Sequence, residues 1–323
     1  MIKAEFPKIK QSRTQGQTGF NTVIDSHVHV LKEKNFDKIT EAKIGHKHPK
    51  DTPIEFLVSW LKDAGVSKAV IMGQDCSRIW NSSCGEDYVL ECVRKYPDLF
   101  VALASVEPVD KWGKFNKSNL EYFEKAVREY GFKGLLLTPP FGYYSSDNPE
   151  AYPFYEKAVE LDVVVQFHHC ASSAGIALAP YKYTNPQSLN NILIDFPGMK
   201  VAIEHMNYPW YEELFWMMMN PNINLYADLA MTYHRPMTLT WNLVKAKEHG
   251  VIDKIMYASD YWVAGSGVFS DNPGNDMKKW IELIKNGINQ ITKRCGWPPF
   301  TQDEIDGILY KNVARLYGFS VPS

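Results

Sequence analysis

A pair of histidines near the beginning of the chain has the side-chain chemistry and the spacing needed to hold a metal ion. His27 and His29 stand two residues apart at the end of the apolar run Thr22 to Val30. A strand places residues two apart on the same face, so both imidazoles would face the interior of a closed barrel. Two buried imidazoles need partners for their nitrogens. A shared divalent cation or hydrogen bonds within the core would each supply them.

Three further residues of the types that bind metals occur at the ends of other apolar runs. His168 ends the fifth run, His205 ends the sixth, and Asp260 ends the eighth. Active sites of α/β barrels are assembled from the carboxyl ends of several strands. Independent placements at strand ends therefore indicate a metal site at the carboxyl mouth of such a barrel.

The elements that would position these residues alternate regularly along the chain. Short β-branched runs are followed by longer segments with helical periodicity, which is typical of parallel strands joined by right-handed crossovers. The eight runs are Thr22–Val30, Lys68–Gly73, Phe100–Val106, Lys133–Thr138, Asp162–His168, Met199–His205, Asn222–Leu229 and Lys254–Asp260. The clearest amphipathic segments are Pro53–Ala64, Ser118–Tyr130, Ala151–Leu161 and Met237–His249.

This alternation predicts an α/β fold of the (β/α)8 TIM-barrel type. A doubly wound open sheet is the second candidate. Two more helical patterns, Asp276–Lys293 and Thr301–Tyr317, follow the eighth run and would pack on the outside of the barrel. No linker divides the chain, so we predict one domain over residues 1–323 with the barrel core at about 22–318.

The charge and hydropathy of the chain argue against nucleic acids and membranes as binding partners. The formal net charge of −2 offers no basic field for nucleic acid, and no dense basic run would attract a membrane surface. The beginning of the chain lacks the apolar core of a secretory signal, and no window approaches a membrane span. We therefore expect a cytoplasmic protein with a small-molecule substrate, no nucleic-acid or membrane partner, and a homodimer as the candidate assembly.

The donor set limits the choice of ion. Nitrogen and carboxylate ligands suit Zn²⁺, Mn²⁺, Fe²⁺ or Co²⁺, and we expect Zn²⁺. The five cysteines include no C-x-x-C pair, which argues against a thiolate zinc site. A two-ion centre would need a bridging group such as a carboxylated lysine on the fourth run, but Lys133 begins that run instead of ending it. One ion is therefore expected.

Several motifs resemble the amidohydrolase-related family, which includes aminocarboxymuconate semialdehyde decarboxylase, resorcylate decarboxylases and lactone or amide hydrolases. The resemblance extends over about Val23 to Gly318. The motifs are Ile24-Asp25-Ser26-His27-Val28-His29, Gly131-Phe132-Lys133-Gly134-Leu135, Phe167-His168-His169-Cys170, Ala202-Ile203-Glu204-His205, Tyr257-Ala258-Ser259-Asp260-Tyr261 and Asn312-Val313-Ala314-Arg315-Leu316-Tyr317-Gly318.

The resemblance implies that His27, His29, His168 and Asp260 bind the metal, with His205 as a catalytic residue or a further ligand. Where family members often have a glycine two residues after the fifth-strand histidine, this chain has His168-His169-Cys170. Either histidine could therefore be the ligand. Strand register favours His168, because it ends an alternating run.

Other polar residues are candidates for substrate contact or for structural roles. His234 and Arg235 follow the seventh run, Arg78 follows the second, and Trp262 follows Asp260. Barrel geometry would place these residues at the mouth, where they could bind the substrate. Glu204 precedes His205, and strand alternation predicts that it points away from the interior as a structural group.

The expected chemistry is hydrolysis by a metal-activated water. Asp260 would accept the proton of the water and pass it to the leaving group, while His205 would polarise the substrate oxygen. Aromatic residues near the mouth favour a small cyclic, aromatic or unsaturated acid as substrate. Non-oxidative decarboxylation is the alternative, because the same fold supports both reactions. A barrel that binds a ligand without catalysis is a third reading.

Overall fold

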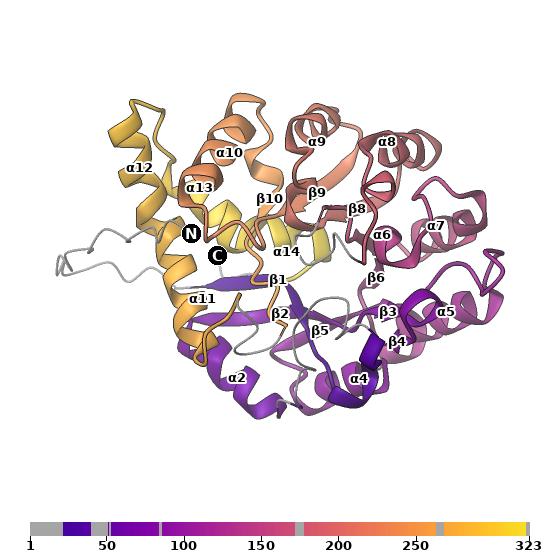
Figure 1. Cartoon of the computed structure of the whole chain (residues 1–323). Helices are drawn as coiled ribbons and strands as arrows, with labels where there is room; N and C mark the ends of the chain where they lie inside the picture. The colour runs from indigo at the N-terminus through magenta and orange to yellow at the C-terminus, as the bar shows by residue number, and fades with distance from the viewer. Residues whose placement is uncertain are drawn as a thin grey trace.

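Eight parallel strands form one sheet whose order follows the order of the chain (Figure 1). The computed structural model describes residues 22–39, 51, 53–83, 86–171, 178–262 and 268–320. All eight strands predicted from the apolar runs are confirmed. They are β1 (Val23–His29), β2 (Val66–Met72), β5 (Phe100–Ser105), β6 (Gly134–Leu137), β7 (Val164–Phe167), β8 (Lys200–Ile203), β9 (Asn224–Asp228) and β10 (Ile255–Met256).

The sheet closes on itself through the segment that follows β10. Ser26 donates its amide to the carbonyl of Tyr257 over 3.1 Å, and Asp260 donates its amide to the carbonyl of His27 over 2.9 Å. His29 donates in the same way to Tyr261 over 2.8 Å. A doubly wound sheet would reverse its strand order, whereas this order runs around a barrel. The predicted TIM barrel is therefore confirmed.

Helices surround the strands, and their apolar faces cover the outer surface of the barrel (Figure 1). In α5, for example, the Asn116 side chain accepts the amide of Asn119 at the beginning of the helix, and Gly131 ends it with a φ of 74°. Phe123 and Ala126 face the core from this helix. The surrounding helices are α2 (Ile54–Asp63), α4 (Glu86–Lys95), α5 (Lys117–Tyr130), α7 (Tyr152–Glu160), α8 (Pro186–Asp195), α9 (Tyr211–Met218), α10 (Pro236–Glu248) and α11 (Pro273–Glu282).

Short elements occupy the connections between strands and helices. They are η1 (Glu33–Asn35), β3 (Asp75–Cys76), α3 (Ser77–Trp80), β4 (Ser82–Ser83), α6 (Pro139–Gly142), η2 (Pro149–Ala151), η4 (Tyr181–Tyr183), η5 (Glu204–Asn207) and η6 (Ile252–Lys254). Within the described ranges, the helices are all too short or too polar to cross a membrane.

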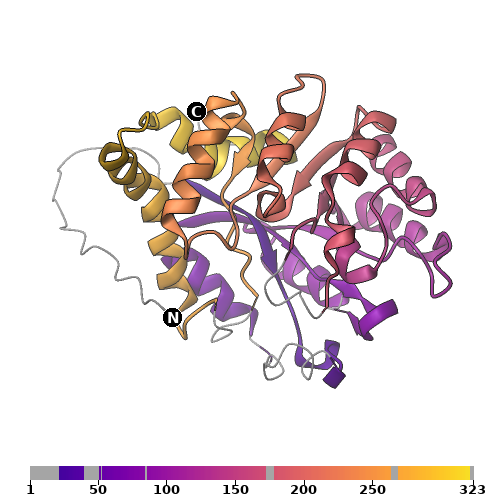
Figure 2. The same cartoon turned by 45° about the horizontal axis from the view of Figure 1, so that its top comes forward.

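The last helices divide between the outside and the floor of the barrel. α12 (Ile288–Cys295) continues α11 through the π turn η7 (Leu283–Gly287) and packs beside α10, as the turned view shows (Figure 2). α13 (Gln302–Asp306) leads through the π turn η8 (Gly307–Lys311) into α14 (Asn312–Tyr317).

The expectation that both C-terminal segments pack outside is wrong for α14. Val313, Leu316 and Tyr317 join the interior cluster of the barrel, which includes Ile24 and Leu136. The amino ends of the strands would otherwise expose apolar interior side chains to water, so α14 covers the floor and buries them.

Strands β6 and β7 are packed so closely at Gly134 that no side chain fits there. A Cβ atom at this position would lie 2.2 Å from the carbonyl oxygen of Val164, its partner in the ladder between β6 and β7. We expect Gly134→Ala to lower the free energy of unfolding by about 1 to 3 kcal/mol or more, because the backbone itself must move. Gly198→Ala is the matched control, since a Cβ there has no neighbour within 4 Å. Equal melting temperatures for the two variants would contradict this packing.

Candidate metal centre and active site

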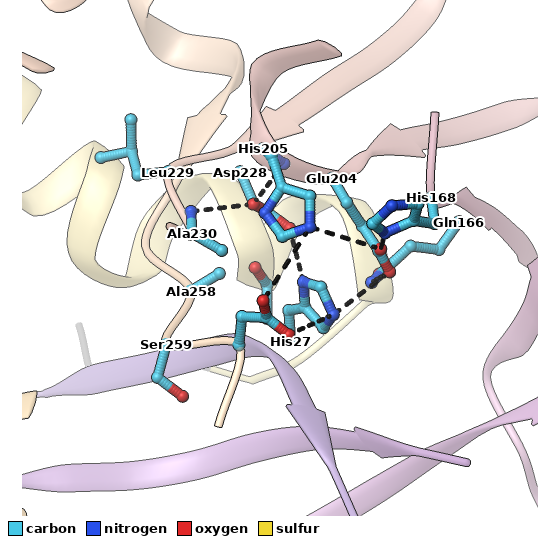
Figure 3. Close-up of polar contacts among 12 residues, drawn as sticks. His27, Gln166, His168, Glu204, His205, Asp228, Leu229, Ala230, Ala258 and Ser259 are labelled. Atoms are coloured by element: carbon cyan, nitrogen blue, oxygen red, sulfur yellow. Dashed lines mark hydrogen bonds and ion pairs between the residues drawn. The ribbon is translucent and has the colours of Figure 1, made fainter. Parts of the chain in front are cut away.

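Six side chains with metal-binding or acid–base chemistry meet at the carboxyl mouth of the barrel (Figure 3 shows four of them together with Asp228). They come from β1, from the ends of β7 and β8, and from the segment after β10, as the strand ends predicted. The six are His27, His29, His168, Glu204, His205 and Asp260, and the Cys170 thiol lies with His168 and His205 as a seventh potential ligand.

A register irregularity in β1 turns both predicted histidines inward. Ile24 belongs to the interior cluster, so strict alternation would place His27 on the outer face. The ladder with β2 shifts between Asp25 and Val28, which restores the interior for His27 and the outer core for Val28. His27 and His29 therefore share one face, as their spacing predicted.

Three of these side chains place their ligand atoms at the separations that a single ion requires. His27 Nε2 lies 3.0 Å from His29 Nε2 and 3.4 Å from Asp260 Oδ1. His29 Nε2 lies 3.6 Å from the same oxygen. Two ligand atoms each about 2.1 Å from one ion are about 3.0 Å apart at a right angle and about 3.4 Å apart at the tetrahedral angle. The residues present therefore fit a divalent ion.

Each of the two β1 histidines has an acceptor for its other ring nitrogen. His27 Nδ1 lies 3.1 Å from Asp228 Oδ2, and His29 Nδ1 lies 3.1 Å from the carbonyl oxygen of Gly73. An acceptor opposite Nδ1 holds the proton there and leaves Nε2 with a free lone pair. Both lone pairs then point toward Asp260. Asp228 received no role from its sequence position, although its place two residues after the inward Tyr226 indicates the same face.

The adjacent histidines at the end of β7 separate to opposite sides. His168 continues the inward alternation of Val164 and Gln166 and lies in the mouth. His169 points away, where its Nδ1 lies 3.0 Å from Asn207 Oδ1 and its Nε2 lies 3.3 Å from Ser188 Oγ. The geometry supports the choice of His168 that strand register favoured.

The prediction that Glu204 points away from the interior is wrong. Ala202 faces the interior, so alternation carries Glu204 inward and would carry His205 outward. The strand ends at Ile203, and His205 begins a left-handed turn with a φ of 57° that brings its ring into the mouth as well. Both residues therefore face the site. The prediction failed because it extended β8 through His205.

Asp228 holds this turn in place. Its Oδ1 accepts the backbone amide of His205 over 2.8 Å and that of Ala230 over 3.0 Å, while its Oδ2 faces His27. One carboxylate thus supports both the turn that presents His205 and the tautomer of His27.

Glu204 contacts the histidines around it. Its Oε2 lies 2.9 Å from His168 Nδ1 and 3.9 Å from His205 Nε2. Its Oε1 lies 3.3 Å from His27 Nε2. Cys170 Sγ lies 3.5 Å from His168 Nε2, so one of the packed cysteines also reaches the site.

Burial dominates the electrostatics of the site. Burial lowers the pKa of His29 to about 3, with the nearby His27 as the second cause, and lowers the pKa of His168 to about 3. It also lowers the pKa of His205 to about 4. These imidazoles are therefore neutral at pH 7 and can act as ligands or hydrogen-bond partners. Burial, together with Glu204, raises the pKa of Asp260 well above its usual range.

The residues predicted to contact substrate are spread around the mouth. Arg78 Nε donates to Glu107 Oε2 over 2.7 Å, while its Nη2 is buried without a hydrogen-bond partner among the described residues. His234 and Arg235 are exposed, and the Arg235 guanidinium lies 5.9 Å from the Tyr208 ring centre. Trp262 packs against Phe36 with ring centres 5.8 Å apart. The structure joins none of these four side chains to the histidine cluster through a described contact.

A pocket of 440 Å³ opens among the loops beyond β2, β5, β6 and β7. Arg78 lies at its wall together with Tyr143 and Tyr183, whose rings are stacked with centres 5.9 Å apart. Phe141 connects this wall to the site, because its ring centre is 4.8 Å from that of His168. A pocket of this size holds a small organic molecule.

The fold and this mouth define a metal-binding TIM-barrel enzyme. A family model described as amidohydrolase matches residues 24–319, so the chain belongs to the amidohydrolase family, as the motifs predicted.

A curated relative and a solved structure show what this chain is similar to. A 2-keto-4-carboxy-3-hexenedioate hydratase from a Sphingobium species is 29% identical over 233 residues, which cover 64% of this chain and 65% of the relative. A probable 2-pyrone-4,6-dicarboxylic acid hydrolase from Acinetobacter baumannii, solved with citric acid, has a TM-score of 0.62 at 19% identity, covering 92% of this chain and 99% of that one.

A decarboxylase has the same fold. Dihydroxybenzoic acid decarboxylase from Polaromonas, solved with manganese and the inhibitor 2-nitroresorcinol, has a TM-score of 0.61 at 15% identity and covers 94% of this chain and 98% of that one. At these identities the solved structures establish the fold.

Asp228 provides a test of the site geometry. Asp228→Ala would leave the buried amides of His205 and Ala230 without their shared acceptor, and each such loss costs about 1 to 3 kcal/mol. Asp228→Asn can keep an oxygen at the Oδ1 position, so its free energy of unfolding should stay much closer to that of the wild type. Thermal and urea unfolding of both variants would measure the difference. Equal destabilisation would show that Oδ1 does not hold the turn.

Proposed function

We propose that this enzyme is a metal-dependent hydrolase of a small cyclic or unsaturated carboxylic acid. The observation that carries the proposal is the convergence of His27 Nε2, His29 Nε2 and Asp260 Oδ1 within 3.6 Å of one another. Neutral imidazoles with free lone pairs, facing a carboxylate, are the donor set of a catalytic divalent ion.

We assign one ion to His27, His29 and Asp260, with His168 as the fourth protein ligand. Zn²⁺ is the proposed ion, and Mn²⁺, Fe²⁺ and Co²⁺ suit the same donors. When bound, such an ion lowers the pKa of a water molecule from about 15.7 toward ~7 and polarises a carbonyl oxygen.

Asp260 and His205 are the proposed catalytic residues. Asp260 Oδ2 lies 3.9 Å from His205 Nε2, so both groups face the same small volume. As a carboxylate beside the ion, Asp260 can accept a proton from the attacking water and release it to the leaving group. His205 is neutral and can hold the substrate oxygen while charge develops on it.

The relatives support an acidic, unsaturated substrate. The hydratase adds water to an unsaturated acid, as its name states, and the pyrone hydrolase opens a cyclic dicarboxylate. Both names describe attack by water. We place the substrate between the ion and the tyrosine-lined pocket, where Arg78 is the proposed contact. His234, Arg235 and Trp262 follow β9 and β10 and are proposed contacts from a different part of the mouth.

Decarboxylation is the second candidate, favoured by the likeness to the manganese-containing decarboxylase. In decarboxylation the carbon dioxide leaves as a neutral molecule, and the electron pair left on the substrate carbon needs a proton donor or a nearby cation. Arg78 is paired with Glu107, and Arg235 lies exposed beside Tyr208. This arrangement favours hydrolysis.

We further propose a cytoplasmic, single-domain protein that assembles as a homodimer.

Metal analysis tests the ion site directly. The purified enzyme should contain about one equivalent of a divalent transition metal, and the His27→Ala/His29→Ala double variant should contain almost none. His234→Ala is the control, because His234 is exposed and outside the cluster. Full metal occupancy in the double variant would contradict the assignment of His27 and His29 as ligands.

Turnover on a substrate panel tests the reaction. We expect the enzyme to hydrolyse 2-pyrone-4,6-dicarboxylate, followed by ultraviolet absorbance. Consumption of 2-keto-4-carboxy-3-hexenedioate alone would instead indicate hydration, which adds water to a double bond and cleaves no leaving group. We expect no release of carbon dioxide from 2,6-dihydroxybenzoate. His205→Asn should fold normally and lose at least about 10²-fold in kcat, the usual scale for a positioned acid or base. Carbon dioxide release without any consumption of the first two acids would replace hydrolysis with decarboxylation.

A further inference from the structure

A chain of buried hydrogen bonds runs through the barrel from the floor helix to the mouth. The Tyr317 hydroxyl donates to Gln166 Oε1 over 2.7 Å, and Gln166 Nε2 donates to Glu204 Oε1 over 2.9 Å. Glu204 Oε2 then lies 2.9 Å from His168 Nδ1. All four residues are at most 8% exposed. Figure 3 shows its upper part, with Glu204 between Gln166 and His168.

The chemistry of the groups sets the direction of every bond in this chain. A carboxylate oxygen accepts hydrogen bonds, so Gln166 Nε2 donates to Glu204 Oε1 and His168 Nδ1 donates to Glu204 Oε2. Gln166 therefore turns its NH₂ toward Glu204 and its oxygen toward Tyr317, which must donate. His168 consequently carries its proton on Nδ1, which leaves the Nε2 lone pair to accept from the Cys170 thiol, 3.5 Å away, or to bind a metal ion.

The surroundings make these polar groups costly unless they are fully paired. Gln166 lies in an interior layer whose neighbours include Val164, Leu136 and Met72. An apolar side chain of similar size would fill that layer without loss of hydration. A continuous chain of satisfied hydrogen bonds is the arrangement that permits polar groups there, and it fixes their orientation.

We propose that Tyr317, Gln166 and Glu204 are positioning residues that hold His168 in the tautomer able to bind the ion. This inference rests on the proposed ion site. It adds a role for Tyr317, which lies outside that site at the opposite end of the barrel. Carboxylates that hold ligand histidines commonly change metal affinity about 10- to 100-fold when lost. Tyr317, Gln166, Glu204 and His168 together form this relay of hydrogen bonds.

The test compares metal affinity in variants that interrupt the relay at different distances from the ion. Zn²⁺ and Co²⁺ dissociation constants would be measured by chelator competition, with visible absorption of bound Co²⁺ as a readout of its ligands. We expect Gln166→Met to weaken binding by about 10- to 100-fold and Tyr317→Phe by a smaller factor. Because both changes interrupt one chain, the double variant should match Gln166→Met alone.

Tyr155→Phe is the matched control for the loss of a buried tyrosine hydroxyl. Tyr155 is fully buried and donates to the Ser146 carbonyl over 2.7 Å, on the helical side of the barrel. This variant should lose stability like Tyr317→Phe and keep wild-type metal affinity.

A second measurement uses the metal-free wild type and needs no stable variant. The ¹⁵N shifts of His168, assigned by their absence in His168→Gln, should report a protonated Nδ1 and an unprotonated Nε2. The opposite tautomer would overturn the relay, as would unchanged metal affinity in both Gln166→Met and Tyr317→Phe. A loss of affinity shared by Tyr155→Phe would also overturn it. Wild-type protein that binds no divalent ion would overturn the ion site itself.

Discussion

The requirement that a buried imidazole be uncharged and have an acceptor at Nδ1 organises three histidines in the mouth of this barrel, His27, His29 and His168. Asp228, the Gly73 carbonyl and Glu204 each face the Nδ1 atom of a different histidine. These acceptors come from three separate elements, so the barrel must close before any of the three rings has its orientation. The rings then present Nε2 atoms to the same region. Fold and site are coupled here through hydrogen bonds more than through apolar packing.

Much of the fold and part of the site could be predicted from single residues and periodicity. The eight apolar runs and the strand-end positions of His27, His29, His168 and Asp260 depend on local pattern, which a sequence displays directly. Glu204 could not be placed in this way. Alternation within a strand puts Glu204 and His205 on opposite faces, and the prediction gave the inward face to His205. Both residues face the site because β8 ends at Ile203 and a left-handed turn at His205, held by Asp228 from the next strand, brings that ring inward as well. Contacts between strands decide such details, and no periodicity reports them.

The position of α14 on the floor of the barrel also depends on contacts that are distant in sequence. Its amphipathic pattern indicates that one face is buried, but it cannot distinguish the outer surface of a barrel from its floor. The distinction depends on the open amino ends of the strands, where Ile24 and Leu136 need a cover. Tyr317 is the position at which this cover also meets a polar side chain of the interior, because its hydroxyl reaches Gln166.

The floor helix also bears on how the chain folds during synthesis. α14 packs against β1 and β10, and Tyr257 donates its amide to the carbonyl of Ile308 over 2.7 Å. Residues near opposite ends of the sequence must therefore meet before the interior is sealed. A nascent chain with all eight strands already outside the ribosome would still hold a barrel open to water from below until α14 emerged. Contacts this distant in sequence form late and slowly, so the floor is sealed only after all eight strands have been synthesised.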